Sequence, residues 1–98
     1  MAYKNHWLRR AQDEFDTIYL YYLRRAGEKV AKNRMAKILD ATDILETMPN
    51  IGQLDSQYSH TPTYRYIVVL DYRIYYFIEE ETVNIAAIWD CRQGERPF

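Results

Sequence analysis

Near the end of the chain, three segments rich in β-branched and aromatic residues follow one another with almost nothing between them. They are Tyr64–Leu70, Tyr72–Glu79 and Val83 to about Asp90. Val, Ile, Tyr, Phe and Trp are typical of strands. The connections, Asp71 and the acidic residues 80–82, are too short for helical crossovers. The sequence therefore predicts an antiparallel meander of three strands.

The middle segment of the meander alternates between two kinds of side chain. Because side chains point to opposite faces along a strand, we expect one set to face the core: Tyr72, Ile74, Tyr76 and Ile78. The other set mixes charges with aromatic rings: Arg73, Tyr75, Phe77 and Glu79. Such a face is either open and used for contact or covered by another part of the chain. Our hypothesis is that Tyr75 and Phe77 bind a partner there.

Two stretches before the meander change to the helical period. One stripe of mostly apolar residues recurs at steps of three and four in each. The first stripe is Leu8, Ala11, Phe15, Ile18, Tyr22 and Ala26, and the second is Ala31, Met35, Ile38, Thr42 and Leu45. Gly27 separates the two predicted helices, and Pro49 ends the second. Tyr3–Trp7 is predicted to be a short edge strand and Gln53–Thr63 a loop. The expected fold is α+β in two layers, a strand and a helical hairpin packed on a small antiparallel sheet.

The whole chain, residues 1–98, has the length of one domain, and 48% of its residues are hydrophobic. The formal net charge of −1 gives no indication of nucleic-acid binding. A single cysteine, Cys91, excludes a disulfide framework. No apolar run resembles a signal peptide or spans a bilayer, so we expect a cytoplasmic protein without membrane contact. The sequence has neither a phosphate loop nor a metal-ligand cluster, so we expect that the protein holds no cofactor and no metal.

Few other residues could carry chemistry. Asp90 and Arg92 lie two positions apart and share a face, so the pair is either structural or positions a ligand phosphate. His60 lies in the predicted loop without a recognisable partner, which disfavours a role as general base. Spacing alone does not decide between these alternatives.

Several of these features occur together and in order in one known family. The N-terminal pattern includes Trp7, and Leu45, Pro49 and Gly52 close the second helix. The meander YRYIVVLDYRIYYFIEEETVNIAAIWDCRQ ends in Asp90, Arg92 and Gln93. With this ordered set, almost the whole chain resembles the toxins of the RelE/ParE superfamily, which belong to type II toxin–antitoxin systems of the plasmid-stabilisation kind. The resemblance implies the same fold, a helical hairpin on a small antiparallel sheet.

The resemblance implies one of two mechanisms. RelE-like members cut messenger RNA on the ribosome with basic residues and often a C-terminal aromatic residue. The positions that match theirs are Arg73, Arg92 and, in the preceding strand, at most Arg65; Phe98 stands near their catalytic tyrosine but has no hydroxyl. ParE-like members are not nucleases and poison DNA gyrase. The apolar run Ile67–Val69, where RelE-like members carry lysines, and the compact YRYIVVLDYRIYY hairpin resemble the ParE side more closely.

The favoured interpretation is a cytoplasmic toxin that inhibits growth by binding DNA gyrase and is neutralised by a cognate antitoxin. The alternatives are a ribosome-dependent endoribonuclease and a degenerate toxin that only binds its antitoxin. The resemblance also implies that the antitoxin is a partner, for which Tyr75, Phe77 and Phe98 are the candidate contact residues. A homodimer and a toxin–antitoxin hetero-oligomer both remain open.

Overall fold

The computed structural model describes residues 2–55 and 62–93 of the chain. Its elements follow in the order β1 (Lys4–Trp7), α1 (Arg9–Ala26), α2 (Glu28–Ile44), β2 (Gln53–Leu54), β3 (Arg65–Val69), β4 (Tyr72–Glu79), β5 (Thr82–Asp90) and the short 3-10 helix η1 (Cys91–Gln93). His60 and Phe98, which were considered as functional residues, lie outside the described residues.

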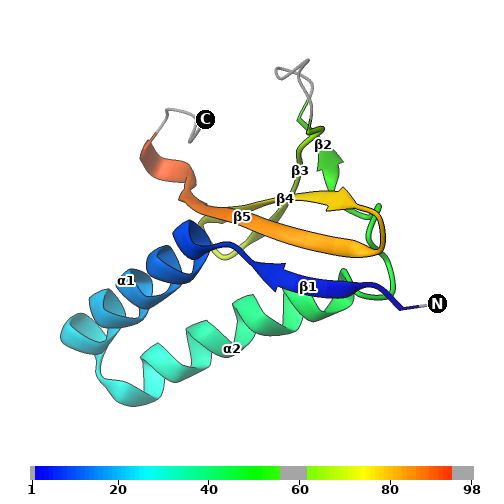
Figure 1. Cartoon of the computed structure of the whole chain (residues 1–98). Helices are drawn as coiled ribbons and strands as arrows, with labels where there is room; N and C mark the ends of the chain where they lie inside the picture. Colours follow the sequence, from blue (N-terminus) through cyan, green and yellow to red (C-terminus); the bar gives the residue numbers. More distant parts are fainter. Residues whose placement is uncertain (1, 56–61, 94–98) are drawn as a thin grey trace.

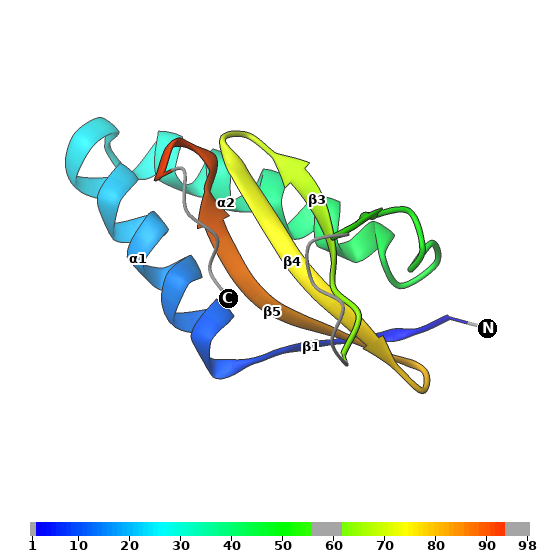
Figure 2. The same ribbon diagram turned by 90° about the horizontal axis from the view of Figure 1, so that it is seen from above.

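The sheet has the strand order β1-β5-β4-β3-β2. Strands β3, β4 and β5 pair antiparallel, as the meander predicts, whereas β1 pairs in parallel with β5 at the edge. Both helices lie on one side of the sheet (Figure 1). Viewed from above, α2 crosses behind the strands and α1 lies beside β5 (Figure 2). The predicted two-layer α+β fold is therefore confirmed.

The core lies between the helices and the predicted face of β4. The side chains of Ile74 and Tyr76 are fully buried, and Tyr72 is 4% exposed. The helical stripes meet them, with Ala11, Ile18, Ala31, Met35, Ile38, Thr42 and Leu45 buried. The assignment of the two faces of β4 is thus confirmed. The stripe of α1 is less buried than predicted, because Phe15 is only partly buried and Ala26, at the end of the helix, is exposed.

A bulge in β5 adjusts which of its side chains enter the core. Tyr75 pairs with Ala87 and Tyr76 pairs with Ile85, so Ala86 is an extra residue in β5. The extra residue shifts the alternation by one, and Val83, Ile85 and Ile88 all join the core. The face of β5 opposite the helices carries the small Ala87, which leaves room for the ring of Tyr75.

The second helix ends earlier than predicted. We expected it to continue to Pro49, but α2 ends at Ile44, and tight turns follow in which Glu46 N–H donates to Asp43 O (3.1 Å). The turns bring Glu46 to the free edge of β1, where its carboxylate accepts the N–H of Asn5 (3.1 Å) and its carbonyl accepts the N–H of Tyr3 (2.7 Å). These tertiary contacts override the helical pattern of the sequence.

Strand β2 lies in the stretch from Gln53 that the sequence predicts to be a loop. The strand has two residues, and it forms because Gln53 and Leu54 pair with Tyr66 and Arg65 of β3. So short a strand has no periodicity from which it could be predicted.

Candidate functional site

The first predicted catalytic residue, Arg73, lies on the sheet face that points away from the helices. Its guanidinium stacks over the ring of Tyr66 at 4.5 Å, and its Nη1 donates to the hydroxyl of Tyr75 at 3.4 Å. The hydrogen bond with Tyr75 raises the pKa of Arg73, which is permanently charged in any case. Arg73 is therefore held against two aromatic residues of the sheet.

The second predicted catalytic residue, Arg92, forms a bidentate ion pair with Asp90. Its Nε and Nη2 donate to the two carboxylate oxygens at 3.0 and 2.8 Å, and its backbone N–H donates to Asp90 as well. The hydrogen bonds from Arg92 hold the pKa of Asp90 below its ordinary value, although burial opposes this effect. Of the two interpretations of this pair, the geometry favours the structural one.

The third predicted catalytic residue, Arg65, points toward the loop after α2. Its Nη1 donates to the carbonyl oxygens of Gly52 (2.9 Å) and Asn50 (3.2 Å). The fold thus gives each of the three arginines a partner within the chain, and among the described residues no hydrogen bond joins any two of them.

Two of the three predicted partner-binding residues, Tyr75 and Phe77, are described by the structure, and they differ in exposure. The expectation of an open face is wrong for Tyr75, whose side chain is fully buried, because its ring lies 5.6 Å from that of Tyr66, over the small Ala87. Phe77 is partly buried, and its ring meets the edge of Tyr64 at 5.7 Å. Whether either residue contacts a partner stays a prediction.

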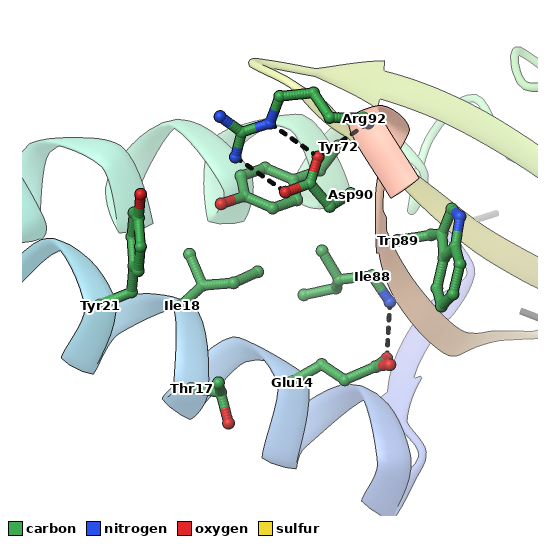
Figure 3. Close-up of a pocket in the computed structure, with 9 residues that line it drawn as sticks. All are labelled: Glu14, Thr17, Ile18, Tyr21, Tyr72, Ile88, Trp89, Asp90 and Arg92. Carbon is green, nitrogen blue, oxygen red and sulfur yellow. Dashed lines mark hydrogen bonds and ion pairs between the residues drawn. The ribbon is translucent and has the colours of Figure 1, made fainter. Parts of the chain in front are cut away.

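A cleft of about 610 Å³ lies on the other side of the molecule, between α1 and the end of β5 (Figure 3). Its lining residues are Glu14, Thr17, Ile18, Tyr21, Tyr72, Ile88, Trp89, Asp90 and Arg92. Glu14 closes one wall, because its Oε1 accepts the backbone N–H of Ile88 at 2.9 Å. The Asp90–Arg92 ion pair forms the rim at the end of β5 (Figure 3).

The sequence pattern does not indicate this cleft. One wall of the cleft comes from α1, and the rest comes from β4, β5 and η1, more than 50 positions later in the sequence. Only the packing of α1 beside β5 brings them together. The one available signal was the departure of Glu14 and Tyr21 from the apolar stripe, which is also normal for an exposed helix face.

Two properties of the described residues bear on the class of protein. In this part of the chain, no group of three His, Cys, Asp or Glu side chains is placed to hold a metal ion. Neither described helix has the length and apolar character needed to cross a membrane.

Comparison with known proteins defines the class. Residues 6–94 match the profile of the ParE toxins of the type II toxin–antitoxin system parDE. The chain therefore belongs to the ParE toxin family, as the resemblance on the ParE side predicts. No curated protein matches the sequence. Among solved structures, the fold is similar to a chain of the chromosomal ParDE toxin–antitoxin system from P. aeruginosa, with 20% identity, a TM-score of 0.77, and coverage of 91% of this chain and 96% of that one.

Proposed function

We propose that this ParE-family toxin inhibits growth by binding DNA gyrase in the cytoplasm and catalyses no reaction itself. The observation that carries this proposal is the state of the three arginines that a RelE-like nuclease would need. Arg92 is paired with Asp90, Arg73 is stacked on Tyr66, and Arg65 is bound to backbone carbonyls. Membership of the ParE family supports the same interpretation.

The competing hypothesis is a ribosome-dependent endoribonuclease. Such an enzyme needs cations at the scissile phosphate and a group that activates the 2′-hydroxyl. Arg92 would have to leave Asp90 before it could stabilise a phosphate, and Arg65 would have to leave its two carbonyl partners. These contacts weaken the nuclease hypothesis.

Alanine variants of Arg73 and Arg92 distinguish the two hypotheses. A nuclease should lose toxicity in Arg73→Ala with Arg92→Ala, because each arginine would supply about 2–4 kcal/mol of transition-state stabilisation. We expect the folded double variant to remain toxic and to inhibit gyrase. Its affinity for gyrase should be less than about tenfold lower than that of the wild type. Loss of toxicity together with cuts in transcripts at codon boundaries in the wild type would overturn the proposal.

We further propose that a cognate antitoxin neutralises the toxin and that the sheet face around Phe77 contributes to its binding. Phe77 and Tyr64 present an edge-to-face aromatic pair at this surface. Phe77→Asp should lower the affinity for the antitoxin by about tenfold, whereas Phe77→Leu should retain most of it. Tyr75→Asp is not a suitable test, because a charge at a fully buried position would unfold the protein. Unchanged affinity in a folded Phe77→Asp variant would exclude this contact.

A further inference from the structure

A separate cavity lies on another face of α1, where β1 ends and α2 passes. Its volume is about 350 Å³, and its lining residues are Trp7, Gln12, Phe15, Asp16 and Leu39. None of these residues lines the cleft between α1 and the end of β5. Gln12 and Asp16 lie four positions apart on α1, so they share one face of the helix. We call this cavity the Trp7 pocket.

Two aromatic rings form the apolar wall of the Trp7 pocket. The rings of Trp7 and Phe15 lie 5.5 Å apart, with an angle of 78° between their planes. Both side chains are only partly buried, and Leu39 beside them is 43% exposed. Among aromatic side chains, the indole ring attracts cations most strongly. The wall therefore suits a ligand that combines an apolar stem with a positive charge.

The polar groups of the Trp7 pocket also favour a cation. Gln12 donates its Nε2 to the carbonyl oxygen of Trp7 at 2.8 Å, so the amide oxygen of Gln12 remains to accept a donor. Asp43 lies one helical turn beyond Leu39 on the same face of α2. Within the described part of the chain, neither Asp16 nor Asp43 takes part in an ion pair. The pocket thus offers an acceptor and uncompensated negative charge.

The arginines of the chain show which kind of cation binds aromatic rings in this protein. Three guanidinium groups lie over tyrosine rings at 4.5–5.1 Å, and the pairs are Arg25 with Tyr21, Arg34 with Tyr22 and Arg73 with Tyr66. Among the described residues, no arginine lies over the ring of Trp7. Arg9 and Arg10, which are close in sequence, form ion pairs with carboxylates of α1. The chain therefore leaves its Trp7 site open to a guanidinium from outside.

Ordinary packing explains part of this arrangement. Trp7 and Phe15 pack against the edge of the core, and an exposed aspartate is normal on a helix surface. Packing does not explain why the rings, the acceptor of Gln12 and the carboxylate of Asp16 line one cavity. A guanidinium group fits this combination better than an ammonium group, because it is planar, stacks on aromatic faces and donates two parallel hydrogen bonds to a carboxylate.

We propose that the Trp7 pocket binds a guanidinium group carried on an aliphatic stem. The guanidinium group stacks on the ring of Trp7 and donates to the carboxylate of Asp16 and the amide oxygen of Gln12. The stem covers the apolar surface of Phe15 and Leu39. The same chemistry is present in free guanidino compounds and in arginine side chains of a partner protein, and the experiments below distinguish these two sources. Binding of the cation does not depend on the proposed function.

The first experiment titrates the toxin with butylguanidinium, and its matched control is butylurea, which has the same planar shape but no charge. NMR spectra follow the indole N–H signals of Trp7 and Trp89. Trp89 is an internal control, because it lines the cleft at the end of β5 and not the Trp7 pocket. We expect millimolar butylguanidinium to shift the signal of Trp7 alone and butylurea to leave both signals unchanged.

The second experiment compares two variants that each remove one negative charge from α1. Asp16→Asn alters the Trp7 pocket, and Asp13→Asn alters an exposed position outside it. The affinity for butylguanidinium should fall at least about fivefold in Asp16→Asn and less than about twofold in Asp13→Asn. Equal shifts with butylguanidinium and butylurea, unchanged affinity in Asp16→Asn, or equal losses in the two variants would overturn the inference.

The same two variants identify the source of the guanidinium group, and this step alone rests on the proposed function. Weaker gyrase inhibition or weaker antitoxin binding in Asp16→Asn, but not in Asp13→Asn, would assign the group to an arginine of that partner. Equal behaviour of the two variants in both assays would assign the pocket to a free guanidino compound. A wild-type toxin that binds butylguanidinium but leaves gyrase active would refute the proposed target and leave the pocket inference standing.

Discussion

At the scale of single residues, Tyr76 connects the loop after α2 to the core. Its ring is fully buried, and its hydroxyl donates to the carbonyl of Pro49 (2.7 Å) and accepts the N–H of Gly52 (2.9 Å). A Cβ at position 52 would overlap the Tyr76 ring, so the close approach requires glycine. These contacts explain why the pattern Pro49 to Gly52 follows the second helix.

Removing the Tyr76 hydroxyl should destabilise the protein. Tyr76→Phe leaves a buried N–H and a buried carbonyl without a partner, which costs about 1–3 kcal/mol in the free energy of unfolding. Urea denaturation measures this loss. Tyr66→Phe is the matched control, because Tyr66 is only partly buried and its hydroxyl forms no hydrogen bond with another described residue. Equal losses in the two variants would contradict the role assigned to Tyr76.

The pKa of Tyr76 predicts how the stability of the protein depends on pH. Burial raises the pKa of Tyr76, although the hydrogen bond from Gly52 partly opposes it. A raised pKa means that the folded state holds the proton more tightly than the unfolded state. The stabilisation is therefore complete below about pH 10 and is lost as the pH rises through the folded pKa. Thermal melts should show a smaller alkaline loss in Tyr76→Phe, with a residual slope from Tyr72, whose pKa is also raised by burial.

The turn between β4 and β5 stores local strain. Glu80 has a φ of 57°, in the left-handed region that glycine adopts without cost, whereas Glu81 does not have a positive φ. Glu80→Gly should therefore raise the free energy of unfolding by about 0.5–1 kcal/mol. Glu81→Gly, its matched control, should lower it, since glycine there only adds freedom to the unfolded chain. A stabilised Glu81→Gly would indicate that charge relief, and not φ, is the cause.

At the scale of elements, adjacent residues of α2 lie on opposite faces of the helix, one in the core and one at the surface. Ile38 is fully buried against the sheet, and Leu39 is 43% exposed. Ile38→Ala should cost about 2–5 kcal/mol in the free energy of unfolding, because it leaves a cavity in the core. Leu39→Ala should cost less than about 1 kcal/mol. Comparable losses measured by denaturant unfolding would mean that α2 is packed by a different face.

The elements also show what the sequence could predict. The strands of the meander and both helices were predictable, because Tyr72–Glu79 alternates and the helical stripes recur over many residues. The burial of Tyr75 could not be predicted from the sequence, because it depends on the neighbouring Tyr66 and Ala87 and on the bulge at Ala86. The cleft was not predictable either, because it forms between elements distant in the sequence.

At the scale of the whole molecule, the fold closes one edge of its sheet and part of β5 with carboxylate side chains. Glu46 covers the outer edge of β1, and Glu14 covers β5 where β1 no longer pairs with it. Unpaired strand edges invite addition of other strands, so both contacts limit unwanted association. The described surface also has a cleft between α1 and the end of β5 and an aromatic pair at Phe77. This distribution agrees with a protein that acts by binding.

Titration of gyrase with the purified toxin tests the central claim most directly. The readout is the supercoiling of relaxed DNA as the molar ratio of toxin to gyrase increases. A toxin that acts by binding should inhibit in proportion to its amount and reach its full effect near stoichiometric amounts, without further change over time. Undiminished supercoiling at a large excess of folded toxin, together with progressive cleavage of messenger RNA on ribosomes by a trace of toxin, would contradict the account.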